Sequence, residues 1–435
     1  MSQLASNGSQ INTRFSTLDY IKITILGFAL TAVWSSLHSI VLPLRLLDFV
    51  AESQKNTYLG ILTFAGLILA MATQPVVGAI SDRSSFTWGR RRPYILIGIL
   101  VAVPLLLGIG LASSYIVLFA VYCLLQISCN TAQSPYQAFI PDLVPQNKRG
   151  LASGVKGLLE VLGGVALVRL VAYFMGHYFA GEGGSWLWLS LGVLIIVLGG
   201  AMVATVLTVK ERRRTVTVKL SLLSTLLKSF KISTRTNRDF FLFLISRSIM
   251  GIPGVVLQIF ALYYLMDVVG ITNPAAVAAD LIIVVGVCLL ATVFFAGRLS
   301  DKIGRRPIVA FSGLLGALSI ALLYFARSYI HIMFCGALLG IANGAFLSSS
   351  WALATDLVVK GEEARYLGLL SLAMAGGSAL ARLMGPVIDV FNNINSGLGY
   401  QVMLLVCFLC FIGGALLVMK IRQPQPVIEY EKEEG

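Results

Sequence analysis

The sequence predicts an all-α membrane protein whose twelve transmembrane helices form two pseudo-symmetric six-helix bundles. Of its 435 residues, 57% are hydrophobic and 12% are charged, about half the charge that a soluble domain of this length carries. The apolar residues fall into runs of about 20, the length that a helix needs to cross the hydrocarbon core. A short polar motif also occurs once in each half of the chain, which indicates an internal duplication.

Twelve apolar runs lie between polar loops, six on each side of a central polar segment. The predicted helices span 20–44, 57–80, 93–112, 115–138, 152–176, 186–209, 240–265, 275–298, 307–326, 329–353, 366–389 and 399–420. The chain therefore divides into an N-terminal tail (1–19), a first bundle (20–209), a linker (210–239), a second bundle (240–420) and a C-terminal tail (421–435).

Basic residues concentrate in alternate loops and in the linker, where 210–238 holds nine Lys and Arg. The positive-inside bias then predicts that both termini and the linker are cytoplasmic. Charge spread over alternate loops is not the basic groove of a nucleic-acid-binding protein, so we expect no nucleic-acid partner. In the linker, Leu220, Leu223, Leu227 and Phe230 recur at helical spacing. This pattern predicts an amphipathic helix on the membrane surface, with a flexible tether as the alternative.

The repeated motif follows the second and the eighth predicted helices. Its first copy contains Gly78, Asp82, Arg83, Gly89 and Arg90, and its second copy contains Gly297, Asp301, Lys302, Gly304 and Arg305. A second repeated pair consists of Asp142 with Arg149 and Asp356 with Arg365. Glycine suits a tight turn and arginine suits anionic headgroups, so a static cytoplasmic turn is one interpretation. The repeated carboxylates favour a second one, gate contacts that form and break as the bundles move.

The motif resembles the loop signature of the major facilitator superfamily, Gly-x-x-x-Asp-(Arg/Lys)-x-x-Gly-Arg-(Arg/Lys), which Gly297 through Arg306 match. Five residues separate Arg83 from Gly89 in the first copy. That longer loop, together with the stretch 130–154, is similar to the sucrose-transporter-type and glycoside–pentoside–hexuronide:cation symporter branches. The resemblance implies a transporter that alternates around a midplane site lined by the first, fourth, seventh and tenth helices.

Polar residues in those four helices are candidates for a solute path, because a polar side chain in a membrane span must face protein or water. Gln126, Asn130, Gln133 and Gln137 are spaced by four, three and four, which places them on one helical face. The other candidates are Trp34, His38, Arg247, Gln258, Asn343, Ser350 and Trp351. Such groups suit a neutral polyhydroxylated solute. The alternative is that they bind helices to one another.

The fifth predicted helix holds Lys156 and Glu160, four residues apart on one face. They form either a structural ion pair or a coupling site in which Glu160 carries a proton as Lys156 or Arg247 moves. Asp389 lies near the outer end of its helix and could pair with Arg382. The resemblance implies embedded aspartates in a sodium-coupled relative, and the first, second and fourth helices have none, which favours a proton or no coupling ion.

These observations predict a secondary transporter for a small polar solute, with a sugar or glycoside and proton symport as the favoured interpretation. The alternatives are an efflux transporter for an amphipathic compound and a non-transporting membrane scaffold. The three histidines are scattered and catalytic motifs are lacking, so we expect no enzyme. We also expect no metal, no cofactor and a functional monomer that spans the plasma (inner) membrane many times.

Overall fold

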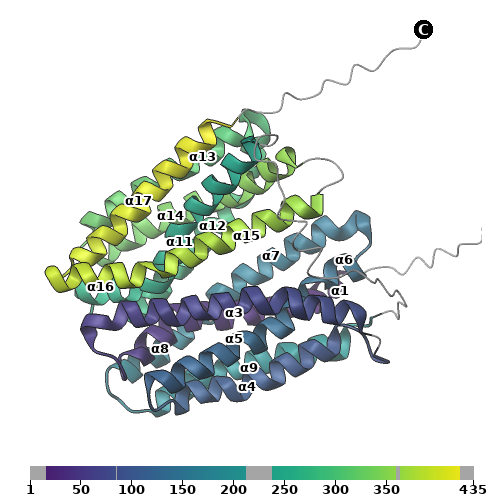
Figure 1. The fold of residues 1–435 in the computed structure, drawn as a ribbon, viewed down its shortest axis with the longest axis horizontal. Helices are drawn as coiled ribbons and strands as arrows, with labels where there is room; N and C mark the ends of the chain where they lie inside the picture. Colours follow the sequence, from purple (N-terminus) through teal and green to yellow (C-terminus); the bar gives the residue numbers. More distant parts are fainter. Residues whose placement is uncertain (1–15, 85, 212–237, 359–362, 422–435) are drawn as a thin grey trace, which may run out of the picture.

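The computed structural model describes residues 16–84, 86–211, 238–358 and 363–421, and within these ranges its secondary structure is helical, without strands. The predicted amphipathic segment at 220–230 and nearly all of both tails lie outside the described residues. Twelve helical segments of the described part are long and apolar enough to cross a membrane, which confirms the predicted number. The two bundles lie one above the other in Figure 1.

The first bundle is built from the purple to teal helices of Figure 1. Its elements are α1 (Thr17–Ser36), η1 (Leu37–Val41), α2 (Leu42–Leu46), η2 (Glu52–Gln54), α3 (Lys55–Arg83), α4 (Arg92–Leu111), α5 (Tyr115–Gln137), α6 (Phe139–Leu143), η3 (Gln146–Lys148), α7 (Arg149–Ala166), α8 (Val168–Phe179) and α9 (Ser185–Thr208). The second bundle contains α11 (Arg238–Tyr264), η4 (Leu265–Val269), α12 (Pro274–Ile303), α13 (Arg305–Phe325), α14 (Tyr329–Leu357), α15 (Glu363–Arg382), α16 (Met384–Ile394) and α17 (Leu398–Met419).

Helices α3, α12 and α14 are longer than the sequence predicts at the end that carries the repeated motif, which we call the signature end. The opposite end of the molecule is called the far end. A helix of 29 residues, such as α3, is about 43 Å long and exceeds a hydrocarbon core of roughly 30 Å. Asp82 and Asp301 therefore lie in the last turns of α3 and α12, where the prediction placed them in loops.

Related irregularities occur in the two bundles. The first span is interrupted by a π-helical segment, η1, the seventh ends in one, η4, and the fifth and eleventh spans break at Leu167 and Leu383. The second break has a clear cause, because Pro386 cannot donate a hydrogen bond to the carbonyl of Arg382 one turn earlier. The duplication visible in the sequence thus extends to the irregularities of the helices.

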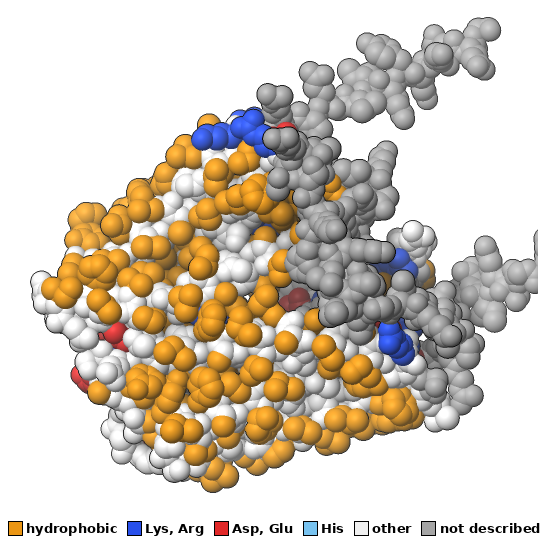
Figure 2. Space-filling model, viewed as in Figure 1, with side chains coloured by type: hydrophobic (Ala, Val, Ile, Leu, Met, Phe, Trp, Pro, Cys, Tyr) orange, Lys and Arg blue, Asp and Glu red, His pale blue; other side chains and the backbone are white. Residues whose placement is uncertain are grey.

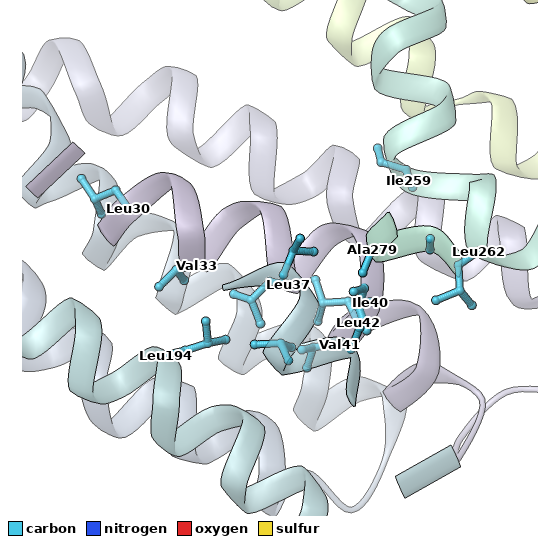
Figure 3. Close-up of a cluster of buried hydrophobic side chains, with 14 of the residues drawn as sticks. Leu30, Val33, Leu37, Ile40, Val41, Leu42, Leu194, Ile259, Leu262 and Ala279 are labelled. Atoms are coloured by element: carbon cyan, nitrogen blue, oxygen red, sulfur yellow. The ribbon is translucent and has the colours of Figure 1, made fainter. Parts of the chain in front are cut away.

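At the far end the bundles share one apolar core. Leu37, Ile40 and Leu42 of the first bundle belong to the same buried cluster as Leu262 and Ala279 of the second, and Figure 3 shows these side chains side by side. Elsewhere the molecular surface is apolar over the helices, and Lys and Arg gather near the signature end (Figure 2). This distribution suits a bilayer around the middle of the molecule.

Gly163 is expected to be essential to the packing of the first bundle. A Cβ at this position would lie 2.1 Å from the carbonyl oxygen of Phe28 on α1. Gly163→Ala should therefore cost about 1–3 kcal/mol of unfolding free energy. The matched control is Gly157→Ala on the same helix, where nothing lies within 4 Å and stability should hold or rise by up to ~1 kcal/mol. Thermal unfolding in detergent measures both, and equal midpoints would contradict this packing.

Candidate functional site

A cavity of about 1250 Å³ lies between the two bundles. Polar residues of the first bundle that line it are Thr31, Trp34, Ser35, Ser39, Gln137 and Ser153. From the second bundle come the polar residues Gln258, Tyr264, Ser319, Asn343 and Trp351. The lining includes Pro141 of α6 and the second turn of α7, so the cavity extends toward the signature end. Seven of the predicted path and coupling residues line it, namely Trp34, Gln137, Lys156, Glu160, Gln258, Asn343 and Trp351.

Lys156 and Glu160 are the charged residues of the described cavity lining. Their Nζ and Oε1 atoms are 3.6 Å apart, and the two side chains are 24% and 36% exposed. The ammonium group of Lys156 also lies 5.4 Å from the centre of the Tyr136 ring. Gly27 on α1 leaves the space for these groups, because a Cβ there would lie 2.2 Å from the Tyr136 hydroxyl and 3.1 Å from Glu160 Cγ. The pair is loose and faces the cavity, so either partner has room to change contacts.

His38 lies behind the cavity wall and supports Trp34. The two rings are stacked, with centres 5.3 Å apart and planes inclined by 19°. His38 belongs to the π-helical segment η1, whose wider turn changes the direction of its side chains relative to a regular helix. Its Nε2 lies 2.8 Å from the Tyr122 hydroxyl. A residue predicted to touch the solute thus contacts a tryptophan of the cavity wall instead.

The predicted amide face of α5 divides between the cavity and the interior of the first bundle. Gln137 lines the cavity. Gln126 and Asn130 are buried, and Gln126 donates to Tyr122 (2.7 Å) while Asn130 Nδ2 donates to the Gln126 side-chain oxygen (3.1 Å). Gln74 of α3 donates to Asn130 (2.7 Å). These side chains form a hydrogen-bonded chain from α3 through α5 to His38.

Gln133 lies half-buried on α5 and does not line the cavity. Arg247 and Ser350 are likewise placed behind the wall of the second bundle. Arg247 is 4% exposed, donates to the Ser350 hydroxyl, and has its guanidinium carbon 4.8 Å from the ring centre of Trp351. Arg247 therefore supports Trp351 from behind, much as His38 supports Trp34. Trp351 of α14 and Gln258 of α11 themselves line the cavity.

The bundles are joined at the far end by polar contacts as well as by the apolar core. Lys55 Nζ lies 2.7 Å from Asp267, which also accepts a hydrogen bond from the Tyr400 hydroxyl (2.6 Å). Asp389 does not pair with Arg382 as the sequence analysis suggested. It accepts from Asn56 Nδ2 (2.8 Å) and from the backbone N–H of Thr57 (2.6 Å), so a carboxylate of α16 caps the N-terminal turn of α3 in the other bundle.

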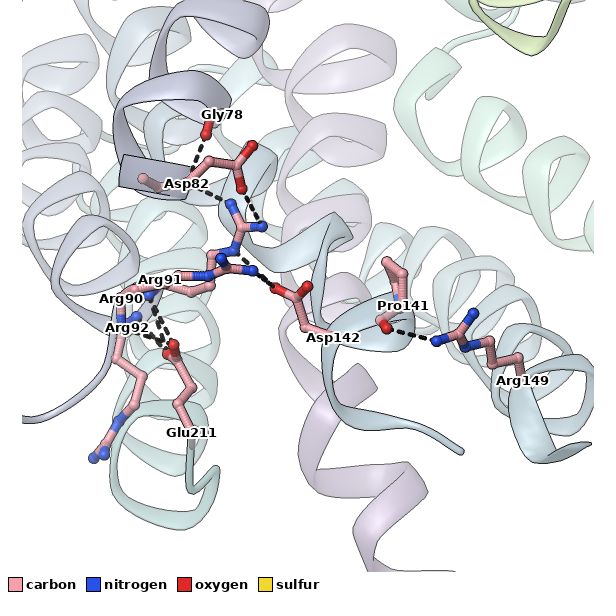
Figure 4. A network of polar contacts seen from close by, with 10 residues as sticks. Gly78, Asp82, Arg90, Arg91, Arg92, Pro141, Asp142, Arg149 and Glu211 are labelled. Carbon is pink, nitrogen blue, oxygen red and sulfur yellow. Dashed lines mark hydrogen bonds and ion pairs between the residues drawn. The ribbon is translucent and has the colours of Figure 1, made fainter. Parts of the chain in front are cut away.

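The first signature loop is an ion-pair network that stays within the first bundle (Figure 4). Arg91 binds Asp82 (2.5 Å) and Asp142 (3.1 Å), and Arg90 also binds Asp142 (2.7 Å). The Glu211 carboxylate accepts the backbone N–H groups of Arg90, Arg91 and Arg92 at the start of α4. Arg149 donates to the carbonyl oxygens of Val144 and Pro141. The two repeated motifs of the sequence therefore bind one another.

The second bundle repeats part of this arrangement. Arg305 pairs with Asp356 at 2.5 Å, Asp301 is exposed at the end of α12, and the side chain of Arg365 lies outside the described residues. Gly89 and Gly304 have φ values of +129° and +104°, which other residues rarely adopt. A Cβ at Gly78 or Gly297 would lie 2.9 Å from Ser134 Oγ or Ser348 Oγ respectively, so both glycines permit close helix contact.

Several cavity residues were not among the site candidates predicted from the sequence. Ser39, Ser153, Tyr264 and Ser319 line the cavity. Hydroxyl groups are common in membrane helices, where they bond to their own backbone, so their presence alone indicates nothing. Only the packing of η1, α7, α11 and α13 directs these particular residues to the cavity.

The family described as MFS/sugar transport protein matches residues 25–418. The chain belongs to this family. It is accordingly a secondary transporter of the major facilitator superfamily, and it is not an enzyme. The resemblance seen in the signature loops is thereby confirmed.

Curated relatives of this transporter are matched over parts of their length. The minor myo-inositol transporter IolF of Bacillus subtilis (strain 168) is 24% identical over 30% of this chain and 28% of its own. The sucrose transport protein SUT1 of Oryza sativa subsp. japonica is 32% identical over 21% of each chain. The uncharacterised symporter YnaJ of Bacillus subtilis (strain 168) is 24% identical over 75% of this chain and 73% of its own.

Solved structures share the fold at low sequence identity. The crystal structure of the D-xylose-proton symporter matches with a TM-score of 0.73 and 16% identity, covering 93% of this chain and 98% of that one. The nucleoside transporter NupG matches with a TM-score of 0.72 and 13% identity over 92% and 98% of the two chains. These likenesses establish the twelve-helix architecture of the transporter.

The two ion pairs at the signature end should differ in their contribution to stability. Asp142→Asn removes a carboxylate from Arg91, which is 5% exposed. The substitution should lower the free energy of unfolding by about 1.5–3 kcal/mol. Asp356→Asn should cost less, because Asp356 and Arg305 are 40% and 29% exposed and water replaces the lost contact. Denaturation of the purified variants checks the order. An equal or larger loss for Asp356→Asn would contradict it.

Proposed function

We propose that the transporter moves a sugar or a glycoside by alternating access. The observation that carries the proposal is the cavity itself, which lies between two bundles that meet at the far end through Lys55, Asp267, Asn56 and Asp389. If those contacts separate while the bundles approach at the signature end, the same cavity opens to the other side. Binding and release then need no new site.

We place the signature end in the cytoplasm of a cell whose plasma (inner) membrane holds the protein as a monomer. The support is the concentration of basic residues in the loops at that end. In this orientation the structure represents a state closed to the outside. The ion pair between Arg91 and the exposed Asp82 is then our candidate for a contact that rearranges when the cytoplasmic side closes.

The solute class is proposed from the chemistry of the cavity wall. Amides and hydroxyls such as Gln137, Gln258, Asn343 and Ser39 can both donate and accept, which suits a polyhydroxylated solute. Trp34 and Trp351 offer flat apolar faces from opposite bundles. The names of the relatives, a myo-inositol transporter and a sucrose transport protein, are consistent with such a solute.

The coupling ion is proposed to be a proton carried by Glu160. The carboxylate lines the cavity and its partner Lys156 is at ion-pair rather than hydrogen-bond distance. A solute hydroxyl or a small movement of Lys156 would change the stability of the charged form, and proton binding would thereby respond to solute binding. A structural role for the pair is the alternative.

Efflux of an amphipathic compound is the second candidate function. The observation that favours it is the aliphatic character of the second-bundle wall, where Leu257, Leu265, Leu281, Ile282, Leu339 and Leu347 line the cavity. An exported amphipath would use that wall for its apolar part. The two candidates differ in the direction of movement and in the need for sugar hydroxyls.

Purified protein in proteoliposomes should take up at least one radiolabelled member of a panel of sugars and glycosides. The expected result is saturable uptake that unlabelled solute suppresses, measured with and without an inward pH gradient. Liposomes without protein are the control. Movement of an amphipathic dye, with no carbohydrate moving or competing, would overturn the proposal in favour of efflux.

Glu160→Gln should abolish accumulation driven by the pH gradient while preserving exchange of labelled for unlabelled solute, because the amide cannot bind or release the proton. The matched control is Glu182→Gln, which alters an acid paired with His177 in the loop between α8 and α9, outside the cavity lining. The control should accumulate solute normally. Undiminished accumulation by Glu160→Gln would leave the pair with a structural role only.

A further inference from the structure

We infer that the natural solute is an amphipathic glycoside, whose sugar lies on the wall of the first bundle and whose apolar aglycone lies on the wall of the second. The inference rests on the proposed transport of a sugar or glycoside and narrows it. It follows from the unequal chemistry of the two walls and from the size of the cavity.

The first-bundle wall holds both charged residues of the described cavity lining, Lys156 and Glu160, together with the amide of Gln137. Two of its hydroxyl groups are already used, since Thr31 donates to the carbonyl oxygen of Gly27 (2.8 Å) and Ser35 donates to that of Gly164 (2.9 Å). Val161 and Val165, which are apolar residues of the first-bundle wall, point to the contact between the bundles, since a Cβ at Gly286 of α12 would meet both. A sugar ring placed here would find partners for hydroxyls that lose water on binding.

The second-bundle wall is different, because aliphatic side chains predominate in it and the charged residues of the described lining belong to the first bundle. Tyr264 donates to the carbonyl oxygen of Leu323 (3.0 Å), and Ser319 donates to that of Cys335 (2.8 Å). Leu257, Leu265, Leu281, Ile282, Leu339 and Leu347 present aliphatic surface beside them. The amides Gln258 and Asn343 are the polar exceptions. Sugar hydroxyls against such a wall would lose hydrogen bonds to water and gain few in return, whereas an apolar group would bind favourably.

The volume of the cavity supports a solute larger than one sugar ring. Pockets for drug-sized ligands are commonly 300–1,000 Å³, and this cavity is about 1250 Å³. A monosaccharide on the first-bundle wall would leave the aliphatic wall in contact with water. An alkyl or aryl aglycone fills that space and removes the apolar surface from water.

Affinity should rise with the length of an alkyl aglycone. The probe is p-nitrophenyl β-glucoside, whose nitrophenyl group quenches tryptophan fluorescence and would bind near Trp34 and Trp351 in the cavity. Methyl, butyl and hexyl β-glucosides are then used to displace it from protein in nanodiscs. We expect the dissociation constant to fall about fourfold per added methylene, equivalent to ~0.8 kcal/mol, and hexanol to displace far less than hexyl glucoside.

Variants of one residue from each wall test the roles of the two walls separately. Leu281→Ser should reduce the gain per methylene to less than about twofold without changing the affinity for methyl glucoside, and Leu281→Met should retain the gain because it remains apolar. Gln137→Ala should weaken binding of the whole series by one common factor. A change in the gain per methylene in Gln137→Ala and none in Leu281→Ser would assign the walls the other way and overturn the inference.

The outcomes distinguish this inference from the proposed function. Equal affinity along the series, together with measurable sugar uptake in proteoliposomes, would overturn the amphipathic solute and leave sugar transport standing. Displacement by hexanol as strong as that by hexyl glucoside would overturn the sugar half of the inference. Absence of quenching by the nitrophenyl glucoside, with no uptake of any carbohydrate, would overturn both proposals.

Discussion

At the far end, the backbone of α3 lies in close contact with the junction of α15 and α16. A Cβ at Gly60 would lie 2.5 Å from the carbonyl oxygen of Arg382, and one at Gly385 would lie 2.2 Å from that of Asn56. Asp389 adds its carboxylate to the exposed N–H groups at the start of α3. Because this contact joins the two bundles on one side, the space between them becomes a cavity closed at one end.

The contacts at the signature end serve a different purpose, since they connect loops of the same bundle. Arg91 joins the end of α3 to α6 through Asp82 and Asp142, and Arg305 joins the start of α13 to the end of α14 through Asp356. These contacts hold the helix ends of each bundle together, whereas the contacts between the bundles lie at the far end. Polar contacts between the bundles, such as Lys55 with Asp267, join oppositely charged partners. When such a pair separates, hydration of the two charges offsets much of the lost interaction energy.

Apolar run length and charge distribution were sufficient to predict twelve helices, because membrane spans obey one strong constraint of length and polarity. Pro386 accounts for the interruption at Leu383, whereas no proline lies at the interruption at Leu167 or within the π-helical segments η1 and η4. For the site, spacing placed Gln126 and Gln137 on one face. Spacing could not show that α5 packs against α3 at Gln126 and faces the cavity at Gln137. Some partners lie on other helices, such as Gln74 for Asn130 and Tyr122 for His38, and the sequence does not contain those distances.

The polar residues that lie behind the cavity wall have a physical reason to be there. A large aromatic side chain at the edge of a wide cavity has neighbours on one side only, so its orientation depends on what supports that side. His38, held by Tyr122 and through it by Gln126 and Asn130, supports Trp34, and Arg247, held by Ser350, supports Trp351. Each bundle thus fixes one tryptophan with a buried polar group that never needs to touch the solute. The polar positions of these helices consequently divide into those that line the cavity and those that position an aromatic ring, and both kinds shape the same cavity.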